Sequence, residues 1–118
     1  MFDFEKLEVY KEARELNRRV FKEVVLQPNG DTYLYDEVKQ AQLSVLLNIS
    51  EVSTRMTRQE QKRYAIMARG SVSKVVSILQ VMLDLKMISL HTYDDIYSRA
   101  ERVSKMLLGM IRSMNPSS

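Results

Sequence analysis

The chain has 118 residues, of which 45% are apolar and 28% charged, with only three glycines and two prolines. This composition excludes disordered, collagen-like and turn-rich β proteins, and it favours long helices in one domain. The absence of cysteine excludes disulfides, thiolate zinc sites and a cysteine nucleophile, and it favours a reducing cytoplasm.

The sequence gives no indication of a signal peptide or a membrane span. The first residues lack the apolar run of a signal peptide, and no stretch approaches the ~20 apolar residues of a membrane span. The formal net charge of +3 supports polyanion binding only weakly. We therefore expect a cytoplasmic protein with no membrane contact.

Two helices are predicted in the first half of the chain. Apolar side chains recur at steps of three and four residues over about residues 3–25, which is the spacing of one helical face. Pro28 and the Asn29-Gly30 pair end this helix, because proline breaks the hydrogen-bond ladder and Asn-Gly favours a turn. A second apolar stripe predicts a helix over about residues 33–54.

Two more helices are predicted in the second half. Thr57 and Glu60 have the spacing of a capping box, which predicts the start of a helix over about residues 58–86. Ser89 is a candidate N-cap for a helix over about residues 89–114. The connections are short, so neighbouring helices must be antiparallel. The sequence thus predicts an all-α fold, an antiparallel up-down-up-down four-helix bundle that forms a single domain over residues 1–118.

The second predicted helix carries a further apolar arc. At about 100° per residue, Val45 and Ile49 face the bundle, whereas Leu43, Leu46 and Leu47 fall on a neighbouring arc, which we name the leucine flank. Soluble monomers rarely expose such a patch, so the leucine flank is a candidate oligomer interface. The alternative is that long side chains of the first and third helices cover it.

Positive charge is concentrated in residues 53–74, where six basic side chains and one acid give +5. Arg55, Arg58, Lys62 and Arg63 surround the turn between the second and third helices, and we name them the basic cluster. Such a cluster attracts phosphates without reading sequence, which makes it a candidate nucleic-acid-binding site. The alternative is a solvated helix face, and no surface aromatic interleaves with these cations as a stacking platform.

Two polar residues on adjacent predicted helices are candidates for an interhelical polar pair. Glu51 lies near the end of the second helix and Arg69 in the antiparallel third, and a buried pair would fix helix register. Gly70 would let a neighbouring helix approach closely. An active site built from Glu51 and Arg69 is the functional alternative, but no third group completes an acid–base or nucleophilic arrangement.

No catalytic residue, metal or cofactor is predicted. Di-metal bundles need inward Glu-x-x-His repeats, and the single histidine, His91, has no glutamate three residues before it. Phosphate-binding glycine loops, a dinucleotide fingerprint and a nucleophile elbow are absent. We therefore expect a protein that is not an enzyme, with His91 on the surface.

Several motifs together resemble one family. Residues 4–13 (FEKLEVYKEA) look like the opening of the bundle proteins named for the intervening sequences of bacterial 23S ribosomal RNA genes. The similarity continues at residues 42–51, 66–71, 84–89 and 104–107, and residues 66–71 (IMARGS) are similar to the third-helix signature. The resemblance implies a four-helix bundle, a closed homo-oligomer of five subunits, and a role with RNA or reverse-transcriptase machinery. A remotely similar relative is the accessory protein of diversity-generating retroelements.

Three positions depart from the pattern of that family. Leu46 stands where proline is frequent, Val52 where glycine is usual, and Lys74 where an acid is common. The departures bear on a kink in the second helix and on an ion pair at position 74. They leave the bundle itself undisturbed.

The functional expectation is a self-associating, non-catalytic bundle that offers a basic surface to RNA. The alternative is a protein-interaction scaffold whose leucine flank binds a different protein, such as a reverse transcriptase for which it is an accessory subunit. The two differ in whether substitutions in the leucine flank remove a partner or remove self-association.

Overall fold

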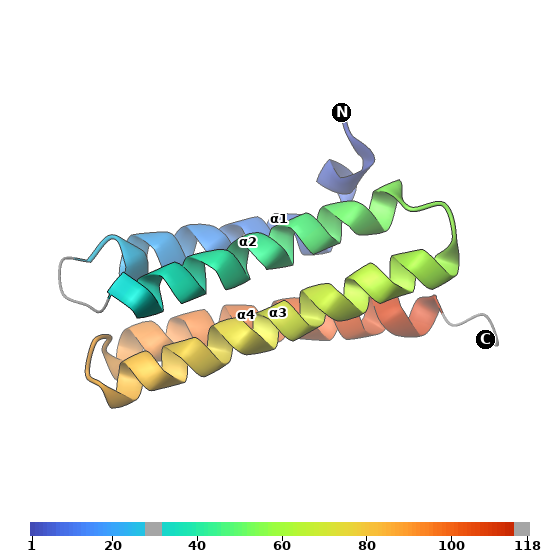
Figure 1. The fold of residues 1–118 in the computed structure, drawn as a ribbon. Coiled ribbons are helices and arrows are strands. Elements are labelled where there is room, and N and C mark those ends of the chain that lie inside the picture. Colours follow the sequence, from blue (N-terminus) through green and yellow to red (C-terminus); the bar gives the residue numbers. More distant parts are fainter. Residues whose placement is uncertain (28–31, 115–118) are drawn as a thin grey trace.

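The computed structural model describes residues 1–27 and 32–114, and in these residues four α-helices build the fold (Figure 1). The helices are α1 (Glu8–Val20), α2 (Thr32–Thr54), α3 (Arg58–Asp84) and α4 (Leu90–Ser113). Both α1 and α3 contact α2 and α4, and successive helices run in opposite directions. The prediction of an all-α, antiparallel up-down-up-down four-helix bundle is therefore confirmed. The predicted turn at Pro28 and Asn29-Gly30 lies outside the described residues.

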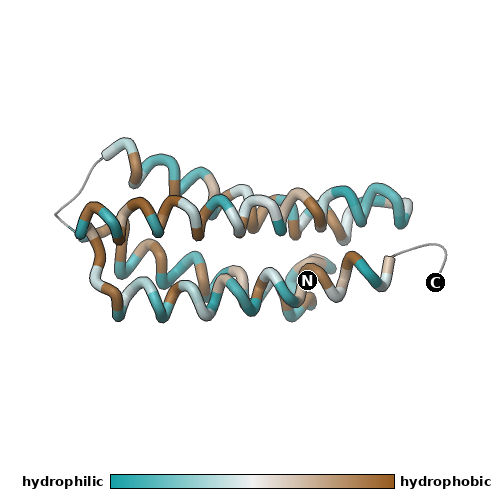
Figure 2. The backbone as a smooth tube through the Cα atoms, turned by 90° about the horizontal axis from the view of Figure 1, so that it is seen from below, coloured by the Kyte–Doolittle hydropathy of each residue, from teal (hydrophilic) through white to brown (hydrophobic). Residues whose placement is uncertain are grey.

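Each helix contributes one apolar stripe to a shared core. Leu16 of α1, Ile49 of α2, Leu79 of α3 and Leu107 of α4 are all 0% exposed. Figure 2 shows hydrophobic residues recurring at intervals along every helix, separated by hydrophilic ones. Burial of each aliphatic side chain contributes about 1.5–3 kcal/mol, so these stripes hold the bundle together.

The segment predicted as one helix over residues 3–25 is divided into three. A short 3-10 helix, η1 (Asp3–Lys6), precedes α1, and a π-helical turn, η2 (Phe21–Val25), follows it. Leu7 separates η1 from α1 because its backbone is extended, with φ −72° and ψ 127°. The stripe of α1 continues through this turn into Val24, which is 0% exposed and follows Val20 by four residues. The stripe was predicted correctly, but the backbone that carries it is not one uniform helix.

The starts of α3 and α4 are capped where the sequence predicts. The Thr57 hydroxyl accepts a hydrogen bond from the Glu60 backbone N–H at 3.2 Å. The Ser89 hydroxyl accepts one from the Thr92 N–H at 3.1 Å. Each bond satisfies one of the free amides of a helix start. Among the described residues the Glu60 side chain accepts no hydrogen bond from the Thr57 backbone N–H, so only one of the two hydrogen bonds of a capping box is formed at Thr57.

One hydrogen bond and one ion pair between described side chains join α2 to α3. The hydroxyls of Ser44 and Ser71 lie 2.7 Å apart and share a hydrogen bond. Lys74 pairs with Glu37 across the two helices at 3.5 Å. Position 74 therefore does make an ion pair, with the lysine supplying the positive member.

α3 is long and apolar enough to cross a membrane when judged by length and composition alone. The expectation that no stretch approaches a membrane span is wrong to that extent. One such helix is weak evidence, because the core helix of a soluble protein meets the same criterion. α3 lies between α2 and α4, with Val72, Val75 and Leu79 in the core that all four helices share.

Candidate functional site

The connection between α2 and α3 brings the basic cluster to one end of the bundle. Arg55 is partly buried there, and its guanidinium pairs with the Glu51 carboxylate one helical turn earlier. The same guanidinium lies over the Tyr64 ring, 4.6 Å from its centroid. The hydrogen bond with Glu51 raises the pKa of Arg55 above its ordinary value. Arg55 is therefore already engaged by its own chain and is the least available member of the basic cluster.

The other three members of the basic cluster face outward to different degrees. Arg58 is exposed, and its Nη1 donates to the Ser113 carbonyl at 3.1 Å, which ties the start of α3 to the end of α4. Arg63 is exposed and lies 5.7 Å from the Tyr64 ring centroid. Lys62 is partly buried. Arg63 and Lys62 belong to no ion pair among the described residues.

One further cation at this end escaped the sequence analysis. Arg112 is exposed in the last turn of α4, next to the carbonyl that Arg58 contacts, and it forms no ion pair within the described residues. The signal was present in the sequence, because an antiparallel fourth helix must end where the third begins. We name Arg58, Lys62, Arg63 and Arg112 together the basic end.

Glu51 does not pair with Arg69 in the described part of the chain. Its carboxylate pairs instead with Arg55, four residues later and directly after the end of α2. The local pair needs no agreement between the axial positions of two helices, and residues at i and i+4 are already neighbours on a helix surface. Arg69 keeps a partly buried side chain whose Nε has no hydrogen-bond partner.

Gly70 does not serve close packing inside the bundle. A Cβ built at this position would meet no atom within 4 Å, and the residue is exposed. Its φ is not positive, so no unusual backbone geometry requires glycine either. The expectation that Gly70 lets a neighbouring helix of the same chain approach is therefore wrong.

The leucine flank divides into one packed and two exposed members. Leu46 is partly buried and packs against the core, so neighbouring helices do cover it. Leu43 and Leu47 are each 56% exposed. Leu43 also borders an apolar hollow of about 230 Å³ between α1 and α2, lined by Phe21 of η2. Two of the three leucines thus remain uncovered within one chain.

A buried polar residue near the leucine flank was missed by the sequence analysis. Gln42 is 1% exposed, and its Nε2 donates to the Asn17 Oδ1 at 3.4 Å, across α1 and α2. Its Oε1 has no partner in the structure. The signal was its spacing, because Gln42 lies four residues after Val38 and so falls on the core stripe. A buried amide with one hydrogen bond favours one register of α1 on α2.

No group of three or more histidine, aspartate or glutamate side chains lies close enough to hold a metal ion in residues 1–27 and 32–114. His91 is exposed in the first turn of α4.

Comparisons with known proteins agree on one family. Residues 5–109 match the family model of the 23S rRNA-intervening sequence protein. The fold is similar to the crystal structure of a protein of unknown function from the S23 ribosomal protein family of Bacteroides thetaiotaomicron, with a TM-score of 0.79 and 17% identity. The aligned region covers 87% of this chain and 97% of that one, and at this identity it shows a shared fold. No curated protein matches the sequence.

Proposed function

The chain belongs to the 23S rRNA-intervening sequence protein family, and from this membership and the geometry of its surface we propose a non-catalytic bundle that self-associates and binds RNA. The observation that carries the proposal is the basic end, where Lys62, Arg63 and Arg112 have no acidic partner among the described residues. Phosphates are the natural counterions of such a surface.

The basic end favours contacts with the RNA backbone over contacts with bases. Arginine forks bind phosphate oxygens in pairs, and lysine binds them as a point charge. Tyr64 is occupied by Arg55 on its ring, so it is not free to stack on a base. Binding should therefore tolerate changes of RNA sequence and weaken strongly with salt.

Self-association is supported by the exposure of Leu43 and Leu47. A second copy that covers these side chains buries the apolar surface that they still expose, which contributes about 1–1.5 kcal/mol for each half-exposed leucine. A closed ring of copies, five by family resemblance, would repeat the basic end around one axis. Repetition of a weak phosphate-binding surface raises its overall affinity through effective concentration.

Retention on a structured RNA tests the RNA part of the proposal. The triple variant Arg58→Glu, Lys62→Glu, Arg63→Glu should bind far more weakly at low salt, and its slope of log affinity against log salt should be shallower by about 2–3. The matched control carries Lys22→Glu, Lys39→Glu and Lys86→Glu at the opposite end of the bundle and should retain most of the binding. No retention by the natural protein at low salt, or equal retention by the triple variant, would remove RNA from the proposal.

The exposed leucines also support the second candidate, a scaffold that binds a different protein. Under that function a Leu43→Asp, Leu47→Asp variant, which changes the two exposed members of the leucine flank, loses the partner in a pull-down but keeps its own oligomeric state. Under self-association the same variant loses its oligomeric state. The two candidates are thus separated by one pair of measurements on one variant.

A further inference from the structure

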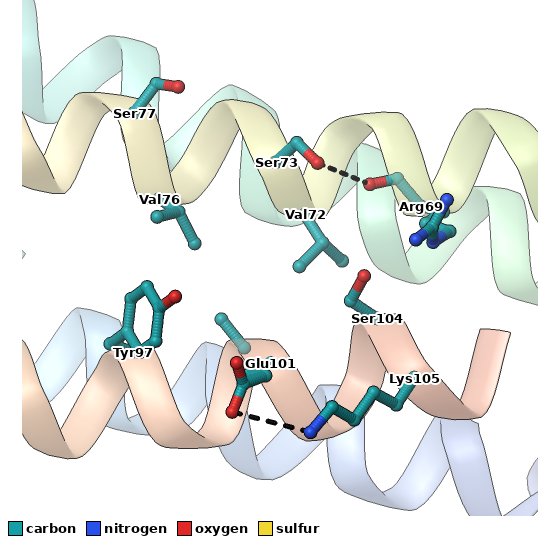
Figure 3. Close-up of a pocket in the computed structure, with 10 residues that line it drawn as sticks. Arg69, Val72, Ser73, Val76, Ser77, Tyr97, Glu101, Ser104 and Lys105 are labelled. Carbon is teal, nitrogen blue, oxygen red and sulfur yellow. Dashed lines mark hydrogen bonds and ion pairs between the residues drawn. The ribbon is translucent and has the colours of Figure 1, made fainter. Parts of the chain in front are cut away.

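A groove runs along the face of the bundle formed by α3 and α4, away from the α1–α2 side that carries the leucine flank (Figure 3). It consists of two adjoining hollows of about 440 and 300 Å³, which share Arg69 and Ser73. We name the two hollows together the α3–α4 groove. Its residues belong neither to the basic end nor to the leucine flank.

Arg69 brings positive charge to the middle of the groove, and no acid in the described part of the chain pairs with it. Its Nε is enclosed and has no hydrogen-bond partner, and the side chain forms no ion pair in the described residues. Arg55 and Arg99 also have an enclosed Nε, but each pairs with an acid four residues earlier in the chain. No acid among the described residues neutralises the guanidinium, so a carboxylate that enters the groove would meet no competing anion at Arg69.

The acid that lines the larger hollow, Glu101, pairs with a cation other than Arg69. Glu101 pairs with Lys105 at 3.7 Å, one turn along α4, and Figure 3 shows both on the rim opposite α3. The lining of the larger hollow therefore holds two cations and one anion. Charge complementarity calls for a carboxylate at Arg69.

Apolar side chains line the groove on both sides of Arg69. Toward one end Val72, Val76 and Tyr97 line the larger hollow, and Tyr97 is 39% exposed. Toward the other end lie three further apolar residues, of which Ile66 is 50% exposed: Ile66, Leu108 and Ile111. The complementary ligand is apolar at both ends and acidic between them.

Gly70 indicates that the ligand is a helix. Glycine inside a helix costs about 0.5–1 kcal/mol relative to alanine, and nothing within the bundle uses the missing Cβ. Gly70 lines the smaller hollow, beside Arg69. Bare backbone at the floor of a groove allows a second helix to approach more closely than any side chain would permit.

We propose that the α3–α4 groove docks an amphipathic helix of a different protein, which places one carboxylate on Arg69 between two apolar anchors. A second copy of this chain does not meet the requirement through its leucine flank, because residues 43–47 carry no acid. The inference concerns a surface separate from the basic end and goes beyond RNA binding. It stands or falls independently of that function.

The test is selection from a phage-displayed library of randomised helical peptides on the immobilised full chain. Enriched peptides should carry a glutamate or aspartate with large apolar residues one turn before and one turn after it. Their affinity, measured by fluorescence anisotropy on synthetic peptides, should fall about tenfold or more in Arg69→Gln and when the peptide acid is changed to its amide.

Gly70→Phe provides a second variant that fills the groove without disturbing the fold, since its Cβ meets no atom within 4 Å. It should abolish peptide binding while keeping the thermal unfolding transition. Gly109→Phe is the matched control, because Gly109 is also helical, exposed and unobstructed but lines neither hollow.

Four outcomes would overturn the proposal. They are no enrichment of any peptide, enriched peptides without a conserved acid, and peptide binding that survives both Arg69→Gln and Gly70→Phe. The fourth is that Gly70→Phe alters the oligomeric state or RNA retention, because a second copy or an RNA would then be the occupant. The basic-end variants leave the groove unchanged, so failure of RNA binding alone does not count against it.

Discussion

Glu15 links two arginines on the outer face of α1. Its carboxylate accepts hydrogen bonds from Arg18 at 2.7 Å and from Arg19 at 3.2 Å, and Arg19 continues to Glu23 at 3.2 Å. The hydrogen bond from Arg18, followed by that from Arg19, lowers the pKa of Glu15 to about 2. Such pairs form between residues three or four apart, so they follow from helical spacing alone.

The lowered pKa of Glu15 predicts a component of acid sensitivity. A carboxyl with a depressed folded-state pKa stabilises the protein above its unfolded pKa, near 4.5, and this stabilisation is lost as pH falls toward about 2. In urea titrations at a series of pH values, the difference in free energy of unfolding between the natural protein and Glu15→Gln should shrink across this window. Salt at about 1 M should reduce the difference, because solvent and ions reach these partly exposed side chains. A difference that stays constant with pH would contradict the assignment.

α3 ends in a hydrogen-bonded cap although no glycine is present. Lys86 adopts a φ of 60°, the Lys86 N–H donates to the Leu83 carbonyl at 3.0 Å, and the Met87 N–H donates to the Met82 carbonyl at 2.8 Å. These two hydrogen bonds together form the Schellman motif. Met87 packs against the core beyond it, which stabilises the turn into α4. The predicted end near residue 86 was close, but the left-handed residue that makes the end was not foreseen.

Lys86→Gly should stabilise the protein. A left-handed conformation costs a residue with a Cβ about 1–2 kcal/mol, whereas glycine adopts it freely but loses about 0.5–1 kcal/mol more entropy on folding. The net expectation is a gain of about 0.5–1 kcal/mol in the free energy of unfolding, measured by chemical denaturation. Lys86→Ala keeps the strain and should show little change. An equal gain for both variants would assign the effect to the loss of the lysine charge.

The bundle as a whole buries the apolar stripes of its four helices but leaves two leucines exposed. Four stripes close around a single axis, with α1 and α3 each between α2 and α4. Leu43 and Leu47 lie outside this closed arrangement and are 56% exposed, whereas Leu46 is drawn inward. The proposed self-association would bury the two exposed members without reorganising the core.

Leu43→Asp with Leu47→Asp should dissociate the oligomer and preserve the helices. Because each leucine is already about half covered, burial of the pair at an interface contributes about 2–3 kcal/mol, and the dissociation constant should rise about 30–100-fold. Sedimentation velocity at micromolar protein measures the oligomeric state, and circular dichroism checks the fold. Leu90→Asp, at a leucine that is 62% exposed at the start of α4, is the matched control and should change neither. A natural protein that sediments as a lone protomer would refute self-association.

The sequence by itself determined the four helices, the residues that start α3 and α4, and the stripes that meet in the core. These features depend on spacings of three and four residues and on the capping residues at helix starts, and both can be identified in the sequence. It also located the basic cluster, because residues close together in a helical turn remain close after folding.

Only the tertiary structure decided which side chains meet across helices. Glu51 pairs with Arg55 and not with Arg69, which lines a groove. Gln42 is buried in the core, and Gly70 is exposed and contacts no neighbouring helix. Each of these outcomes depends on the rotation and axial offset of one helix against the next. Hydrophobic periodicity limits the rotation to a broad arc and leaves the offset unspecified, so polar contacts between helices could not be read from the spacing of residues.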